Sequence, residues 1–111
     1  MMADFSITSN GPSLFFVGGE LDMATVPLLH VAISEAVARG GPIVLDVTDV
    51  TFIDSTGVSV ILGSVKALPN GCLILHGIHD GVRKVFDLIG VGRSEPKLHV
   101  IPCEYGGVHA S

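Results

Sequence analysis

The sequence lacks the features on which several large classes of protein depend. It has six Lys and Arg residues against eleven Asp and Glu, and the resulting net charge of −5 argues against a basic face for nucleic acid. No apolar run reaches the roughly 18 residues needed to cross a bilayer. The N-terminus has no basic segment followed by a long apolar stretch, so no secretory signal is expected. We therefore expect a cytoplasmic protein that binds neither nucleic acid nor a membrane directly.

Metal-binding, disulfide and catalytic patterns are missing as well. The two cysteines, Cys72 and Cys103, match no metal-ligand spacing, and cytosolic thiols stay reduced. Of the five histidines only His76 and His79 are close in sequence, and they are interpreted as exposed side chains at a strand end rather than as metal ligands. The chain contains no phosphate-binding loop, dinucleotide fingerprint or nucleophile elbow. We therefore predict no enzyme activity, no catalytic residue, no cofactor and no metal.

What the chain does have is a high content of apolar residues. Hydrophobic residues make up 48% of its 111 residues, which is enough to form one packed domain without metal or disulfide bonds. We expect a single domain over residues 1–111, with an ordered core at about 5–101 and a mobile C-terminal tail at 104–111.

The spacing of the apolar residues predicts strands that alternate with helices. Asn10 and Gly11 form a strong turn signal between two short β-rich segments, which predicts an N-terminal hairpin. Thr25 is a candidate cap for the first helix, and Gly40 would end it. The predicted strands cover 5–9, 14–18, 42–47, 72–76 and 98–102, and the predicted helices cover about 26–39, 58–68 and 80–89.

This order predicts the fold class. Parallel strands joined through helices need right-handed crossovers, which place those helices on one side of the sheet. The expected fold is therefore α/β: a single-domain mixed β-sheet with an N-terminal hairpin and parallel strands joined by helices packed on one side.

Polar residues interrupt the apolar pattern in the stretch 50–64, which begins like a buried strand and ends like a buried helix. Here Asp54, Ser55, Thr56 and Gly57 follow one another. The plain interpretation is that Asp54 or Ser55 caps the helix, and that Gly57 lets another backbone come close. One cap residue is enough, however, and a helix N-terminus also binds anions. A phosphate on Ser55 would then be held by free backbone N–H groups, and Gly57 would leave open space beside that serine.

Three segments resemble the STAS domain of bacterial anti-sigma factor antagonists. They are "VGGELDMAT" at 17–25, "IVLDVTDVTFIDSTGVSVIL" at 43–62 and "VRKVFDLIGV" at 82–91, and they occur in the family's order and at its spacing. The resemblance runs from about residue 5 to 101 and implies a STAS-like fold. The chain departs from the family mainly after Gly92, where "RSEPKLHV" is polar and interrupted by proline.

The resemblance also implies a set of roles. It places the family's phosphorylated serine on Ser55, and its partner-binding residues on Asp22, Asp54, Ser55, Thr56 and Gly57. The implied partner is an anti-sigma factor with a histidine-kinase-like ATP-binding fold, which is also the serine kinase, and a phosphoserine phosphatase reverses the modification. The unphosphorylated form would bind the anti-sigma factor and release the sigma factor. Phosphorylation of Ser55 would switch that binding off.

Two other functions remain open from the residues alone. One is a STAS-type accessory or ligand-sensing subunit of a transporter or signalling complex, which additional domains or a stable multi-subunit complex would distinguish. The other is a small enzyme that acts through Asp54 or Ser55, although the catalytic base and the oxyanion donors that such an enzyme needs are missing.

Overall fold

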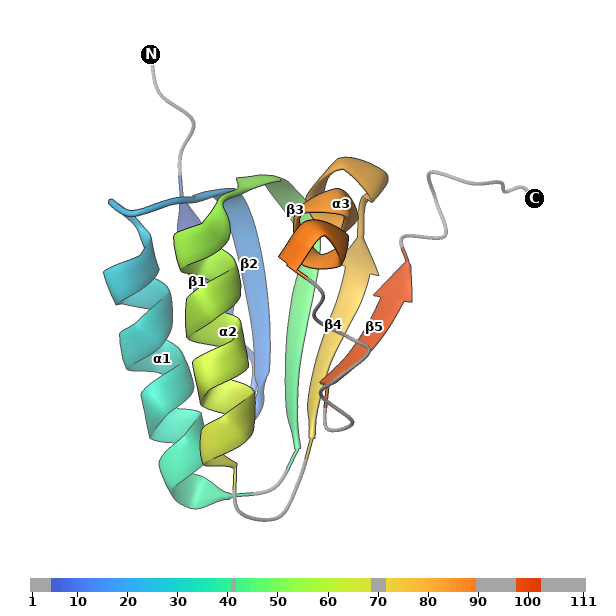
Figure 1. Cartoon of the computed structure of the whole chain (residues 1–111). Coiled ribbons are helices and arrows are strands. Elements are labelled where there is room, and N and C mark those ends of the chain that lie inside the picture. The colour runs from blue at the N-terminus through green and yellow to red at the C-terminus, as the bar shows by residue number, and fades with distance from the viewer. Residues whose placement is uncertain (1–4, 41, 69–71, 90–97, 103–111) are drawn as a thin grey trace, which may run out of the picture.

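The computed structural model describes residues 5–40, 42–68, 72–89 and 98–102, and strands and helices alternate along them in the predicted order (Figure 1). The expected tail at 104–111 lies outside the described residues. The elements are β1 (Ser6–Ser9), β2 (Leu14–Leu21), α1 (Val26–Arg39), β3 (Ile43–Ile53), α2 (Ser55–Ala67), β4 (Leu73–Ile78), α3 (Asp80–Ile89) and β5 (Leu98–Pro102).

The five strands form one mixed sheet whose order in space is β1-β2-β3-β4-β5. β1 pairs with β2 in the antiparallel direction, and every later pair is parallel. Each crossover therefore moves one strand further in the same direction, and right-handed crossovers then place every helix on the same face. Figure 1 shows α1, α2 and α3 in front of the sheet. The predicted fold class is confirmed.

Local signals set the ends of the first elements as expected. The backbone N–H of Asn10 donates to the carbonyl of Leu14 to close the hairpin turn, and Gly11 takes a φ of 91° that a side chain would disfavour. α1 begins after Thr25 and has a proline in its first turn, where the missing N–H has no helical partner in any case. Gly40 ends the helix with a φ of 76°.

β3 is longer than predicted, and this change matters for the site. It runs from Ile43 to Ile53, so that it joins the predicted 42–47 strand to the strand-like start of the 50–64 stretch. Its register against β2 shifts between Phe16 and Gly18 and again between Gly19 and Glu20. α2 starts at Ser55 rather than at the predicted Val58. The strand therefore passes into the helix through the single residue Asp54, with no loop between them.

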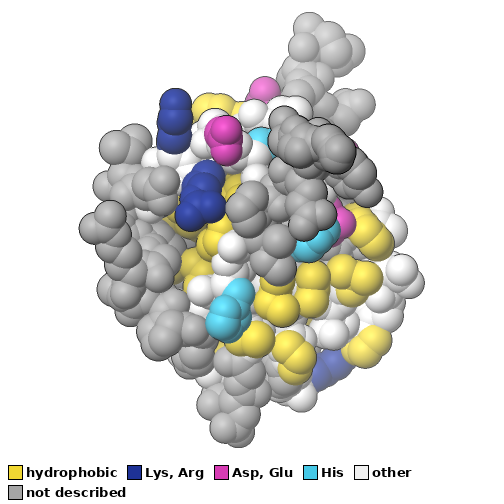
Figure 2. Space-filling view, turned by 90° about the vertical axis from the view of Figure 1, so that its right-hand side faces the viewer, with side chains coloured by type: hydrophobic (Ala, Val, Ile, Leu, Met, Phe, Trp, Pro, Cys, Tyr) yellow, Lys and Arg dark blue, Asp and Glu magenta, His cyan; other side chains and the backbone are white. Residues whose placement is uncertain are grey.

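The hydrophobic core lies between the sheet and its helices, and no helix of the described residues covers the opposite sheet face. Fully buried side chains come from both the sheet and the helices, among them Leu29 of α1, Leu45 of β3 and Val58 of α2. On the open face the register places Val44 beside Ile74, and Ile74 beside His99. Figure 2, which views the molecule from the β5 side, shows hydrophobic and histidine side chains together on the surface. Among the described residues, no helix has the length and apolar character needed to span a bilayer.

Candidate functional site

Asp54 forms the turn between β3 and α2. Its backbone is extended, and its N–H donates to the carbonyl of Leu21 at 3.0 Å. Its carboxylate Oδ1 accepts hydrogen bonds from the backbone N–H groups of Thr56 at 2.9 Å and Gly57 at 3.2 Å. The same oxygen accepts a hydrogen bond from the Thr56 hydroxyl. Of the two caps that the sequence allowed, Asp54 and Ser55, the structure has Asp54.

These contacts stabilise the ionised form of Asp54. The Thr56 hydroxyl is the largest cause that lowers the pKa of Asp54 below its ordinary value of 3.8, and partial burial opposes it. The backbone N–H groups of Gly57, Thr56 and Met23 lower the pKa further. The carboxylate is therefore a fixed negative charge at the start of α2 at neutral pH.

Ser55 and Thr56 differ in what their hydroxyl groups do. The Thr56 side chain is partly buried and its hydroxyl is bonded to Asp54. The Ser55 side chain is exposed, and its hydroxyl makes no hydrogen bond within the described part of the chain. Ser55 is therefore the hydroxyl of this turn that another molecule can reach without breaking an existing contact.

The sequence suggested that free backbone N–H groups in the first turn of α2 would hold a phosphate on Ser55. In the structure most of these groups already have an acceptor. Those of Thr56 and Gly57 are occupied by the Asp54 carboxylate, and that of Val58 by the Asp54 carbonyl. Only the N–H of Ser55 has no partner among the described residues. A phosphate on Ser55 would instead stand next to an anion that already caps the helix.

Gly57 does not leave open space beside the serine, so that expectation is wrong. The residue is buried, and an added Cβ would lie 2.7 Å from Cγ1 of Ile53 and 3.3 Å from Cβ of Leu21. The physical reason is the short turn: because α2 begins one residue after Asp54, its first turn packs back onto the ends of β2 and β3. Gly57 is the residue that permits this approach.

Asp22 holds the neighbouring turn, between β2 and α1. Its Oδ1 accepts hydrogen bonds from the N–H groups of Ala24 at 3.0 Å and Thr25 at 3.2 Å. The Thr25 hydroxyl does not cap α1 as predicted. It donates instead to the carbonyl of Glu20 at 2.6 Å and accepts from the N–H of Asp22 at 3.0 Å. The Thr25 hydroxyl therefore links the turn to the end of β2 by a hydrogen bond.

The two turns lie side by side. Leu21 and Ile53 are paired across the parallel strands β2 and β3, so Asp22 and Asp54, which follow them, stand at the same edge of the sheet. The backbone N–H of Asp54 also donates to the carbonyl of Leu21 at 3.0 Å, which links the start of the second turn to the end of β2, where the first turn begins. The structure thus brings together the five residues that the sequence named, although Gly57 faces the core.

A group of exposed apolar side chains near this edge was not predicted from the sequence. Met23, Leu28 and Val31 have exposed fractions of 75%, 57% and 60%. Met23 is in the Asp22 turn, and the other two lie three residues apart on α1, where side chains are neighbours. The available signal was that Leu28 and Val31 are apolar but fall outside the helical spacing of the buried residues Leu29, Ile33 and Ala36.

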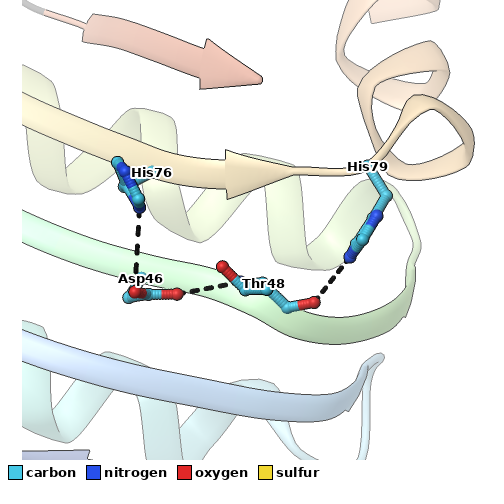
Figure 3. A network of polar contacts seen from close by, with 4 residues as sticks. All are labelled: Asp46, Thr48, His76 and His79. Carbon is cyan, nitrogen blue, oxygen red and sulfur yellow. Dashed lines mark hydrogen bonds and ion pairs between the residues drawn. The ribbon is translucent and has the colours of Figure 1, made fainter. Parts of the chain in front are cut away.

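The histidines on the open sheet face make separate contacts (Figure 3). Nδ1 of His76 lies 3.7 Å from Oδ2 of Asp46, whereas Nε2 of His79 lies 2.6 Å from the Thr48 carbonyl. That carbonyl can only accept, so the His79 nitrogen donates. No group of three potential metal ligands converges anywhere in the described residues. Both histidines are exposed as predicted, but only His79 follows the end of β4, whereas His76 lies within the strand.

Comparison with known proteins identifies the family. The sequence profile of the STAS domain matches residues 6–102. An anti-sigma-B factor antagonist of Listeria monocytogenes is 33% identical over 79 residues, which cover 68% of this chain and 69% of the relative. That of Staphylococcus aureus is 33% identical over 78 residues, which cover 68% and 72%. The chain is a STAS-domain protein and belongs to the family of anti-sigma factor antagonists.

Solved structures support the same assignment. The anti-sigma factor antagonist SpoIIAA in its unphosphorylated form superimposes with a TM-score of 0.67 at 27% identity, over 93% of this chain and 92% of that one. An anti-sigma factor antagonist from Mycobacterium paratuberculosis gives 0.68 at 24% identity, over 87% and 85%, and shows the fold alone. Proteins of this family are non-enzymatic regulators, as predicted for this chain.

Proposed function

We propose that this protein is a phosphorylation-controlled antagonist of an anti-sigma factor. In its unphosphorylated form it binds the anti-sigma factor, so that the sigma factor is released. The observation that carries the proposal is the exposed Ser55 hydroxyl, which makes no hydrogen bond among the described residues while the neighbouring Thr56 hydroxyl is bonded to Asp54. The partner supplies the serine kinase activity, a phosphoserine phosphatase reverses the reaction, and all of them act in the cytoplasm.

The surface around Ser55 supports a docking role. Asp22 and Asp54 stand at one sheet edge, and the exposed side chain of Met23 lies in the turn between β2 and α1. Interfaces commonly combine apolar contacts with charged groups that fix the orientation of the partner. The anti-sigma factor would therefore present an apolar surface with basic side chains that face the two acids.

The position of the cap explains why a phosphate on Ser55 would end this binding. A phosphoserine carries about −1.5 to −2 charges at neutral pH. Because the Asp54 carboxylate occupies the N–H groups of Thr56 and Gly57, those groups are not available to neutralise the phosphate. The phosphate must then be desolvated against a partner surface that fits a neutral hydroxyl, at a cost of several kcal/mol.

Capture of the partner tests the proposal as a whole. A Ser55→Ala bait keeps the neutral surface and cannot be phosphorylated, whereas a Ser55→Asp bait carries a permanent charge. From a lysate of the native organism, the Ser55→Ala bait should retain a protein with an ATP-binding kinase fold, and the Ser55→Asp bait should retain less of it. Equal recovery on both baits, or recovery of no such protein, would contradict the proposed function.

A further inference from the structure

A groove opens on the surface between α1 and α2. Its volume is about 450 Å³, and its walls include His30, Ser34 and Val37 of α1 and Ser59 and Gly63 of α2. Within the part of the chain that the structure describes, no Asp, Glu, Lys or Arg side chain lines it. The groove exists because small side chains cannot fill the space between the two helices, and Gly63 is exposed with no atom within 4 Å of the position of an added Cβ.

The groove continues the surface that carries Ser55. Ser55, Ser59 and Gly63 follow one another at intervals of four residues along α2, so they lie along one side of the helix. Ser59 and Gly63 are exposed, as Ser55 is. A partner that covers Ser55 and extends along α2 therefore enters the groove within about one helical turn.

We propose that the α1–α2 groove receives a helix of the anti-sigma factor that docks at Ser55. The inference rests on the proposed function and extends it by a second contact region. A protein segment fits the groove better than a small molecule, because small-molecule sites are mostly enclosed by apolar and aromatic side chains, and no Phe, Tyr or Trp of the described residues lines this groove. Helix-in-groove docking is a common mode of recognition between proteins.

The lining also sets the chemistry of the docked helix. The hydroxyl of Ser64, on the same wall, is already directed to the carbonyl of Val60 at 2.8 Å. With no charged side chain in the walls, a buried charge on the partner would remain unpaired and would be costly. The docked face should therefore consist of small and apolar residues, in contrast to the charged contacts expected at Asp22 and Asp54.

Filling the groove tests the inference. Gly63→Gln projects a side chain into it from α2, and Ser34→Gln does so from the opposite wall. Gly81→Gln is the matched control, because Gly81 is an exposed helical glycine of α3, also with no atom within 4 Å of an added Cβ. Titration calorimetry with the purified anti-sigma factor and a non-hydrolysable ATP analogue should show binding at least ten-fold weaker for both groove variants. Gly81→Gln should bind within two-fold of the wild type.

The result can be separated from that of the proposed function. If both groove variants bind as the wild type does while phosphorylation of Ser55 weakens binding, the groove inference is wrong and the switch stands. The groove variants could instead leave partner binding unchanged and alter the mass of the free protein in light scattering. The groove would then be an interface between two copies of this chain, and the inference would be wrong. Urea unfolding should show Gly63→Gln to be at least as stable as the wild type, since Gln is the better helix former.

Discussion

The carboxylate of Asp54 accepts a hydrogen bond from the hydroxyl of Thr56, and this contact separates the two hydroxyl groups of the turn. Thr56 is used to fix the charge that caps α2, whereas Ser55, between the two, faces solvent without a hydrogen bond in the described residues. The sequence "DSTG" offers two hydroxyls at adjacent positions. The fold makes one of them structural and leaves the other accessible.

The first prediction concerns the site of modification. Incubation with the anti-sigma factor and ATP should add a single phosphate, on Ser55, because a transfer to Thr56 would require its bond with Asp54 to break. Intact-mass measurement and peptide mapping of the wild type, Ser55→Ala and Thr56→Ser distinguish the two positions. Thr56→Ser keeps the hydroxyl that bonds Asp54, so it should still be labelled on Ser55. Labelling of Ser55→Ala to the wild-type extent would show that the assignment is wrong.

Removal of the Asp54 cap should destabilise the domain. Asp54→Ala leaves the N–H groups of Thr56 and Gly57 without their acceptor, and the loss of such a cap costs about 0.5–2 kcal/mol. Asp54→Asn retains an acceptor oxygen and should lose less. Urea unfolding at neutral pH measures both changes. Stability equal to the wild type in Asp54→Ala would mean that the cap contributes nothing.

The lowered pKa of Asp54 gives the pH dependence of this effect. A carboxyl group whose pKa is lower in the folded state stabilises that state at pH values above its unfolded pKa, here near 3.8. This contribution is lost as the pH falls through the folded pKa. The advantage of the wild type over Asp54→Asn should therefore be constant from pH 7 to about pH 5 and should shrink progressively as the pH falls below about 4. An advantage that grows on acidification would have the wrong sign.

Two glycines of α2 should respond in opposite ways to the same substitution. Gly57→Ala places a methyl group 2.7 Å from Cγ1 of Ile53, a buried side chain with little freedom to move. Overpacking of this kind costs about 1–3 kcal/mol, and the gain of up to about 1 kcal/mol in helix propensity offsets only part of it. The added methyl group of Gly63→Ala would have no atom within 4 Å, so this variant should be more stable than the wild type through helix propensity alone.

The comparison of these two variants by urea unfolding is internally controlled, because the chemical change and the helix are the same. Gly57→Ala should have the lower midpoint and Gly63→Ala the higher. A Gly57→Ala protein that is more stable than the wild type would show that the first turn of α2 has the space which the sequence suggested and the structure does not contain.

The fold could be predicted from the sequence because its signals are local. Asn10 and Gly11 mark the hairpin, Gly40 marks the end of α1, and the apolar spacing of Leu29, Ile33 and Ala36 marks its buried face. The crossover rule then leaves one side for the helices. Family motifs at 17–25 and 43–62 located the two turns that the structure places at one sheet edge.

The details of the site could not be predicted, since they depend on contacts between segments. Either Asp54 or Ser55 could cap a helix, and only the backbone direction after Ile53 selects Asp54. The space around Gly57 depends on how soon α2 turns back over the strand ends. Thr25 stands where a cap residue is common, but its hydroxyl donates to the carbonyl of Glu20 and caps no N–H of α1. In each case a tertiary neighbour decides which local preference is satisfied.

The difference in affinity between the two forms of Ser55 tests the central claim most directly. Titration calorimetry of the purified anti-sigma factor with unmodified and phosphorylated protein should show binding weakened several-hundred-fold by the phosphate, which corresponds to about 3–4 kcal/mol. The free energies of unfolding of the two forms, obtained from melting curves, should agree within about 1 kcal/mol, since the added charge is exposed to solvent. Equal affinities of the two folded forms would contradict the switch.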